Sequence, residues 1–171
     1  MDRVVNVSRC RRTGAFLLHP FGTFRGYGAF VGVNPYRESP ADVDDASLGQ
    51  IVVTLLALSG PTGRDFTEAK LFLEQGRDDE TNRIRSQYGL EGPALSTSKL
   101  ARRFLKADVE QRHGQKSWIV QPFRYDSRLR SMTGSDIPPI RVRQSAGSAA
   151  LGAALRAALA WPDSEVSSSR V

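Results

Sequence analysis

Two Ala- and Leu-rich segments of similar sequence, one in each half of the chain, constrain the fold more than any other feature. Ala46–Ala57 reads ASLGQIVVTLLA, and Ala149–Ala160 reads AALGAALRAALA. Both contain a Leu-Gly pair early in the segment, and a glycine inside a helix costs about 1 kcal/mol relative to alanine. Gly49 and Gly152 therefore predict that another backbone passes close to each helix.

The first segment has clear start and stop signals for a helix over Ala46–Leu58. Asp44 and Asp45 stand before it, where negative charge complements the helix dipole, and Ser59-Gly60-Pro61 stands after it. The second segment predicts a helix between Ser145 and Trp161, which the next residue, a proline, ends.

Strands are predicted ahead of each helix. Ala15–Leu18 and Gly28–Val33 are short apolar runs joined by a Gly-rich stretch. Val109–Phe123 predicts a β-hairpin that turns at His113-Gly114, and Ile137–Arg143 predicts a further short strand. The first residues form a polar start with no assigned element. Shorter helices are predicted at Phe66–Glu74, Asp79–Tyr88 and Lys99–Leu105.

These elements predict one α+β domain over residues 1–163, with helices packed against a mixed or antiparallel sheet. A Ser-rich tail over 164–171 is expected to be disordered. Because each of the two similar helices follows a strand pair and a proline-containing loop, the pattern favours duplicated β-β-α halves. The alternative is coincidence between two Ala- and Leu-rich helices.

Few residues favour catalysis or metal binding. One cysteine, Cys10, excludes an internal disulfide, and one cysteine with His19 and His113 is too few for a structural zinc site. We expect Cys10 to be incidental near a mobile terminus, His19 to be structural, and His113 to be exposed in a turn. The sequence predicts no enzyme, no cofactor and no metal.

No apolar run is long enough to span a bilayer, so we expect no membrane association and a cytoplasmic protein.

Charge divides the chain into an acidic and a basic part, although the formal net charge is +6. Residues 36–80 hold four basic and ten acidic side chains, whereas residues 99–143 hold eleven basic and four acidic ones. The candidate partner-binding residues in the acidic part are Asp42, Asp44, Asp45, Asp78, Asp79 and Glu80. The alternative basic face comprises Arg124, Arg128 and Arg130, with Arg102, Arg103 and Lys106 expected along one nearby helix.

Three segments together resemble one family of bacterial contact-dependent growth inhibition immunity proteins. They are Asp44–Ser59 with its Leu48-Gly49, the hairpin from His113-Gly114 to Phe123, and Ser148–Leu159 with its Leu151-Gly152. The resemblance implies a cytosolic, non-catalytic antitoxin that binds the C-terminal toxin domain delivered by a neighbouring cell and blocks its active site. The basic sequence pI, about 10.0, departs from the acidic surface expected against a basic nuclease toxin.

Two function hypotheses follow. In the first, the chain is an immunity protein that binds a toxin, with the acidic segment occupying a positively charged cleft. In the alternative, it is a small Arg-rich protein that binds nucleic acid through its basic face.

Overall fold

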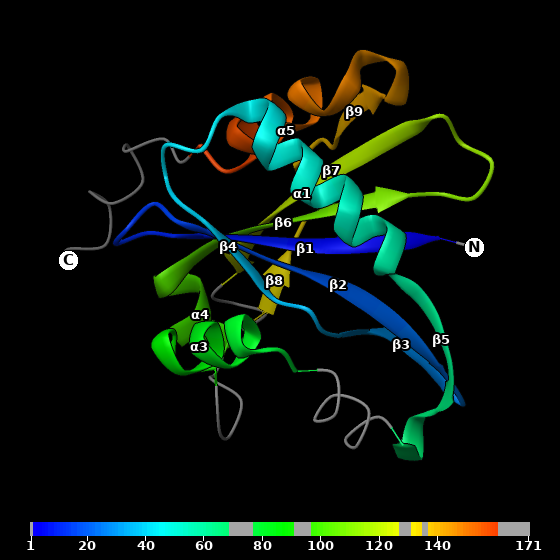
Figure 1. Ribbon diagram of the computed structural model, residues 1–171. Coiled ribbons are helices and arrows are strands. Elements are labelled where there is room, and N and C mark those ends of the chain that lie inside the picture. Colours follow the sequence, from blue (N-terminus) through cyan, green and yellow to red (C-terminus); the bar gives the residue numbers. More distant parts are fainter. Residues whose placement is uncertain (1, 69–76, 91–96, 127–130, 135–136, 161–171) are drawn as a thin grey trace.

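A sheet with two helices packed across one face forms the framework of the molecule (Figure 1). The structure is a computed structural model, and it describes residues 2–68, 77–90, 97–126, 131–134 and 137–160. Its strands are β1 (Arg3–Cys10), β2 (Phe16–Arg25), β3 (Tyr27–Gly32), β4 (Arg37–Ser39), β5 (Gly60–Asp65), β6 (Phe104–Gln111), β7 (Ser117–Asp126), β8 (Ser131–Thr133) and β9 (Ile140–Arg143). Its helices are α1 (Asp45–Leu58), α3 (Asp79–Gln87), α4 (Thr97–Arg103) and α5 (Gly147–Ala158), with 3₁₀ turns at Phe66–Glu68 and Gln144–Ala146.

The two central strands come from opposite halves of the chain. The strand order is β3-β2-β1-β6-β7-β8, and β1 pairs antiparallel with β6 from Arg3 opposite Gln111 to Cys10 opposite Phe104. β4 pairs antiparallel with β2, and β9 with β7, whereas β5 runs parallel to β2. The predicted α+β domain with a mixed sheet is therefore confirmed.

The polar start of the chain, to which the sequence analysis assigns no element, forms the central strand β1. Val5 and Val7 are fully buried and pack in the main core with residues of the two helices. Asn6 and Ser8 alternate with them and are also buried, and the Asn6 side chain donates to Asp108 Oδ1 at 2.8 Å. A strand buried on both faces usually has a continuous apolar run, and these polar residues interrupt it.

The two halves have the same order of elements, as the repeated helices predict. In the first half β1, β2 and β4 lead into α1, and in the second β6, β7 and β9 lead into α5. α1 and α5 lie side by side across the sheet (Figure 1). A Cβ added to Gly49 would lie 1.9 Å from the carbonyl oxygen of Ser148, and one added to Gly152 would lie 2.0 Å from that of Asp45. The close approach of another backbone, predicted from the two glycines, is thus confirmed. The backbone of α5 lies against Gly49, and the backbone of α1 lies against Gly152.

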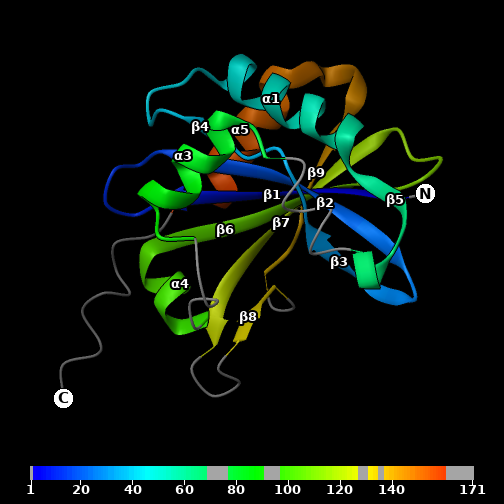
Figure 2. The ribbon, with the colours of Figure 1, turned by 60° about the horizontal axis from the view of Figure 1, so that its bottom comes forward.

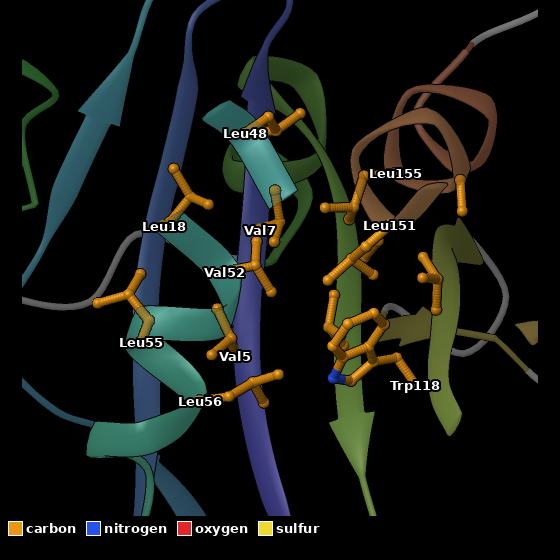
Figure 3. Packing of buried hydrophobic residues seen from close by; sticks show 14 of the residues in the cluster. Val5, Val7, Leu18, Leu48, Val52, Leu55, Leu56, Trp118, Leu151 and Leu155 are labelled. Atoms are coloured by element: carbon orange, nitrogen blue, oxygen red, sulfur yellow. The ribbon is translucent and has the colours of Figure 1, made fainter. Parts of the chain in front are cut away.

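The main core lies between this helix pair and the sheet. Figure 3 shows Val52 of α1 between Val7 and Val5 of β1, and Leu151 of α5 next to Trp118 of β7, with Leu155 on the far side of Leu151. Leu151 and Leu155 are fully buried. A smaller cluster on the opposite face of the sheet joins Ile84 of α3 to Cys10, Leu17 and Phe104.

Several shorter elements cover fewer residues than the sequence predicts. The helix expected over Lys99–Leu105 ends at Arg103, because Phe104 and Leu105 pair with β1 as the start of β6. The strand expected over Ile137–Arg143 begins only at Ile140, after two prolines. Of the helix expected at Phe66–Glu74, only a 3₁₀ turn at Phe66–Glu68 is seen, and residues 69–74 lie outside the described residues. The 164–171 tail also lies outside them.

The hairpin and the short polar helix agree with the sequence. β6 and β7 form the predicted hairpin, with His113 exposed in its turn, and α3 covers the helix expected from Asp79. Pro122 lies in β7 where the strand changes its outer neighbour, because β9 pairs as far as Val120 and β8 pairs from Arg124 onward. A proline fits there because it cannot donate to a sheet hydrogen bond.

Candidate functional site

Two of the predicted acidic residues begin helices. Asp44 is the N-cap of α1 and accepts the backbone N–H of Ser47 at 2.8 Å. Asp78 is the N-cap of α3 and accepts the backbone N–H of Thr81, also at 2.8 Å. Hydrogen bonds from the side chains of Ser47 and Thr81, together with those from their backbone N–H groups, lower the pKa of the Asp44 and Asp78 carboxyl groups, so both remain ionised at neutral pH.

Two further carboxylates pair with arginines that the sequence analysis did not connect to them. Asp45 lies 2.7 Å from Nε of Arg156 in α5. Arg37 of β4 lies 2.8 Å from Asp78 and 3.4 Å from Glu80. All three pairs are partly exposed, so each contributes little to stability.

The remaining two predicted residues, Asp42 and Asp79, are exposed on the loop before α1 and in the first turn of α3. Figure 2 shows α3 beside β4, with α1 close to the same edge. Arg37 connects the two acidic groups, since it holds Asp78 and also lines a groove together with Ser47 of α1. The six predicted residues thus lie before or within the first turns of α1 and α3, and Arg37 and Arg156 pair with three of them, Asp78, Glu80 and Asp45.

The groove beside α1 has an apolar floor. It has a volume of about 600 Å³, and its apolar lining includes Pro35, Ile51, Leu55 and Leu58. Leu58 is 56% exposed, the largest exposure among the bulky hydrophobic side chains of the described residues. We call this feature the acidic-rimmed groove: the α1 face with Pro35 and Arg37, next to Asp44 and Asp45 at the start of α1 and to the carboxylates that Arg37 holds, Asp78 and Glu80. An apolar centre with a charged rim is the common anatomy of a protein-binding surface.

The alternative basic face is only partly described. Arg124 is exposed in β7, whereas Arg128 and Arg130 lie outside the described residues. Lys106 is not on a helix with Arg102 and Arg103, because α4 ends at Arg103 and Lys106 is in β6. The prediction that these three residues share one helix is therefore wrong.

Sequence reasoning missed a different arginine cluster. Arg11 and Arg12 of the β1–β2 turn line the same pocket as Arg102 and Arg103 of α4. The pairing of Cys10, the last residue of β1, with Phe104, the first residue of β6, brings these two basic dipeptides together. Each dipeptide is visible in the sequence, but their contact depends on a strand that was not predicted.

The prediction that Cys10 lies near a mobile terminus is wrong. It is buried at the end of β1 and belongs to the cluster with Ile84 of α3.

His19 lies in a strand as expected, stacked on Tyr36 with ring centroids 4.5 Å apart, and burial lowers the pKa of His19 to about 4. Within the described parts of the chain, no three His, Cys, Asp or Glu side chains come together to hold a metal ion.

No protein-family model matches this sequence, and no curated protein matches it. Two solved structures are similar along nearly their whole length. One is a protein of unknown function, NMB0488 from Neisseria meningitidis, at 22% identity and a TM-score of 0.64, covering 93% of this chain and 94% of that one. The other is a chain of the CdiA-CT/CdiI toxin and immunity complex from Yersinia pseudotuberculosis, at 18% identity and a TM-score of 0.63, covering 93% and 96%. Both likenesses show a shared fold.

The described helices are also too short or too polar to cross a membrane.

Proposed function

We propose that this protein is an immunity protein that binds and neutralises the toxin domain of a contact-dependent growth inhibition exoprotein. The observation that carries the proposal is the common fold with a chain of a toxin and immunity complex, over more than nine tenths of both chains. The residues that resemble the immunity family support it, because the two Leu-Gly segments pack against each other at the centre of that fold. On this proposal the protein acts in the cytoplasm of the cell that makes it.

The acidic-rimmed groove is the surface best suited to the toxin. A nuclease toxin attracts phosphate with a positively charged cleft, and complementary charge speeds association with an acidic inhibitor. Asp42 and Asp79 are exposed carboxylates that cap no helix, and Leu58, at the C-terminal end of α1, adds exposed apolar area to the groove. The partner expected here is a basic protein with an apolar contact of its own.

The proposal predicts that a large exoprotein is encoded directly upstream of this gene, and the experiment uses the C-terminal domain of that exoprotein. The purified domain and this chain are expected to form a stable complex, with an association rate that falls as salt rises. Absence of a complex at micromolar concentrations with a folded toxin domain contradicts the proposal.

Variants then locate the surface. Leu58→Lys places a positive charge in the groove and is expected to weaken toxin binding at least tenfold. Ala57→Lys is the matched control, because Ala57 is exposed on the same helix but does not line the groove. The Asp42→Asn/Asp79→Asn variant is expected to slow association and flatten its salt dependence. If Arg124→Gln slows association while the Asp42/Asp79 variant does not, the acidic surface is the wrong assignment.

A further inference from the structure

The β1–β2 turn, α4 and the end of α3 come together at one end of the molecule (Figures 1 and 2). Residues of these three segments line a second pocket. Its volume is about 570 Å³, within the range of small-molecule sites. Four arginines line it, namely Arg11, Arg12, Arg102 and Arg103, together with Tyr88 and Phe104. Its position separates it from the acidic-rimmed groove, whose lining it does not share.

Backbone contacts fix the segments that carry these arginines. The N–H of Arg11 donates to the carbonyl of Arg103 at 2.9 Å, and Nε of Arg11 donates to the carbonyl of Ala101 at 3.2 Å. A guanidinium N–H of Arg103 donates to the carbonyl of Tyr88 at 3.4 Å. The turn, α4 and α3 are therefore tied together before any ligand arrives, which reduces the entropy lost on binding.

Positive charge dominates this pocket. Among its described lining residues, none carries a carboxylate. Glu38 accepts the Tyr88 hydroxyl just behind the pocket, but Glu38 is already paired with Arg83 at 2.9 Å. Four arginines line this concave site, and the guanidinium groups of Arg11 and Arg103 already donate to backbone carbonyls. A guanidinium group offers planar, paired N–H donors, the geometry that matches phosphate oxygens.

The aromatic residues add a second feature of the site. Phe104 is buried on the pocket floor, and the ring of Tyr88 lies 6.0 Å from it, centroid to centroid. The hydrogen bond to Glu38 holds the Tyr88 ring in place. Phe104 is only 3% exposed, so the partly buried Tyr88 supplies the aromatic ring that a ligand can contact. An aromatic ring beside arginines suits a ligand with a planar ring as well as an anionic group.

We infer that this pocket binds a phosphate-bearing small molecule of nucleotide size, with Arg12 and Arg102 among the phosphate ligands. The inference is independent of the toxin proposal, because it concerns a different surface. An immunity protein with such a site would bind both a toxin and a nucleotide-like anion, and either property can be absent without the other.

Calorimetric titration of the whole protein with inorganic phosphate, pyrophosphate and 5′-GMP tests this inference. Saturable binding is expected for all three, tightest for 5′-GMP if the aromatic residues contribute. Arg12→Ala/Arg102→Ala is expected to weaken binding at least tenfold. Arg141→Ala/Arg143→Ala removes the same charge from exposed positions on β9 and is expected to leave binding within twofold. Circular dichroism confirms that both variants are folded.

Three results would overturn the inference. One is the absence of saturable binding to any of the three anions. Another is equal weakening by the two double variants, which would indicate diffuse attraction to the basic protein as a whole. The third is binding of a hexaglutamate peptide as tight as that of 5′-GMP, which would assign the pocket to an acidic protein segment instead.

Discussion

Replacing Gly49 or Gly152 with alanine tests the contact on which the helix pair depends. The added Cβ would lie 1.9 Å from the Ser148 carbonyl oxygen in the first case and 2.0 Å from the Asp45 carbonyl oxygen in the second. Both obstacles are backbone atoms of the facing helix, so no side-chain rotation can relieve them.

The size of the effect follows from these distances. An ordinary contact of this kind is 3.4 Å or longer. The helices must therefore separate by about 1.5 Å, which opens the close-packed core beneath them. Overpacking costs about 1–3 kcal/mol, and more when backbone must move. The facing backbone must move here, so we take the upper end of this range, about 3 kcal/mol. Since alanine is about 1 kcal/mol better than glycine in a helix, we expect a net loss of about 2 kcal/mol. For a domain of this size that lowers Tm by about 4–8 °C.

Chemical and thermal denaturation of the single and double variants measure this loss. Because both substitutions push apart the same crossing, the Gly49→Ala/Gly152→Ala variant should cost little more than the worse single variant. The controls Ala57→Gly and Ala153→Gly, at exposed helix positions, report the local helix preference. If Gly49→Ala stabilises the protein by about the amount that Ala57→Gly destabilises it, the helices are not in backbone contact and the reasoning fails.

Three further predictions concern the core, a helix cap and a buried carboxyl. Leu151→Ala should cost about 2–5 kcal/mol, because Leu151 is fully buried between α5 and the sheet; a loss below about 0.5 kcal/mol would place it outside the core. Asp78→Ala should cost about 1 kcal/mol of unfolding free energy through the lost N-cap, and Asp79→Ala, its exposed neighbour, should cost much less; equal losses would argue against the cap. Burial raises the pKa of Asp108 to about 6, so its ionisation in the folded protein makes stability fall as pH rises from about 4 to 6. His19, with its pKa lowered to about 4, acts in the opposite direction over the same range, so wild-type stability should change little there. Asp108→Asn removes the falling contribution, and urea titrations should show the variant gaining on wild type by up to about 2 kcal/mol between pH 4 and 7; a constant difference would contradict the raised pKa.

Local signals were sufficient for some elements of the fold and not for others. The helix over Ala46–Leu58 has an acidic start and a Ser-Gly-Pro stop, and the β6–β7 hairpin has a glycine turn, so both could be predicted. β1 could not be recognised, because its Asn6 and Ser8 are polar and yet buried: Asn6 donates to Asp108 of β6, and Ser8 donates to Asn6 within the strand. β5 begins with Gly60-Pro61, which signals the end of α1 and conceals the strand that follows.

The candidate sites, like the fold, could be predicted from the sequence only in part. Charge counting along the sequence located the acidic segment, and the structure describes all six of its candidate residues. It could not show that Asp44 and Asp78 cap helices, or that Arg37 joins two acidic groups. The arginine pocket was beyond sequence reasoning, because Arg11 meets Arg103 only through the pairing of β1 with β6. Sites assembled by long-range strand pairing need the fold before they can be seen.

Growth of cells that express the neighbouring toxin domain tests the central claim most directly. The toxin domain is induced with and without this protein, and survival is counted while tagged protein is recovered to detect the complex. The account predicts that cells survive only when this protein is present, that toxin co-purifies with it, and that Leu58→Lys loses protection while Ala57→Lys retains it. Cell death despite abundant, folded protein, with no toxin recovered, would contradict the account.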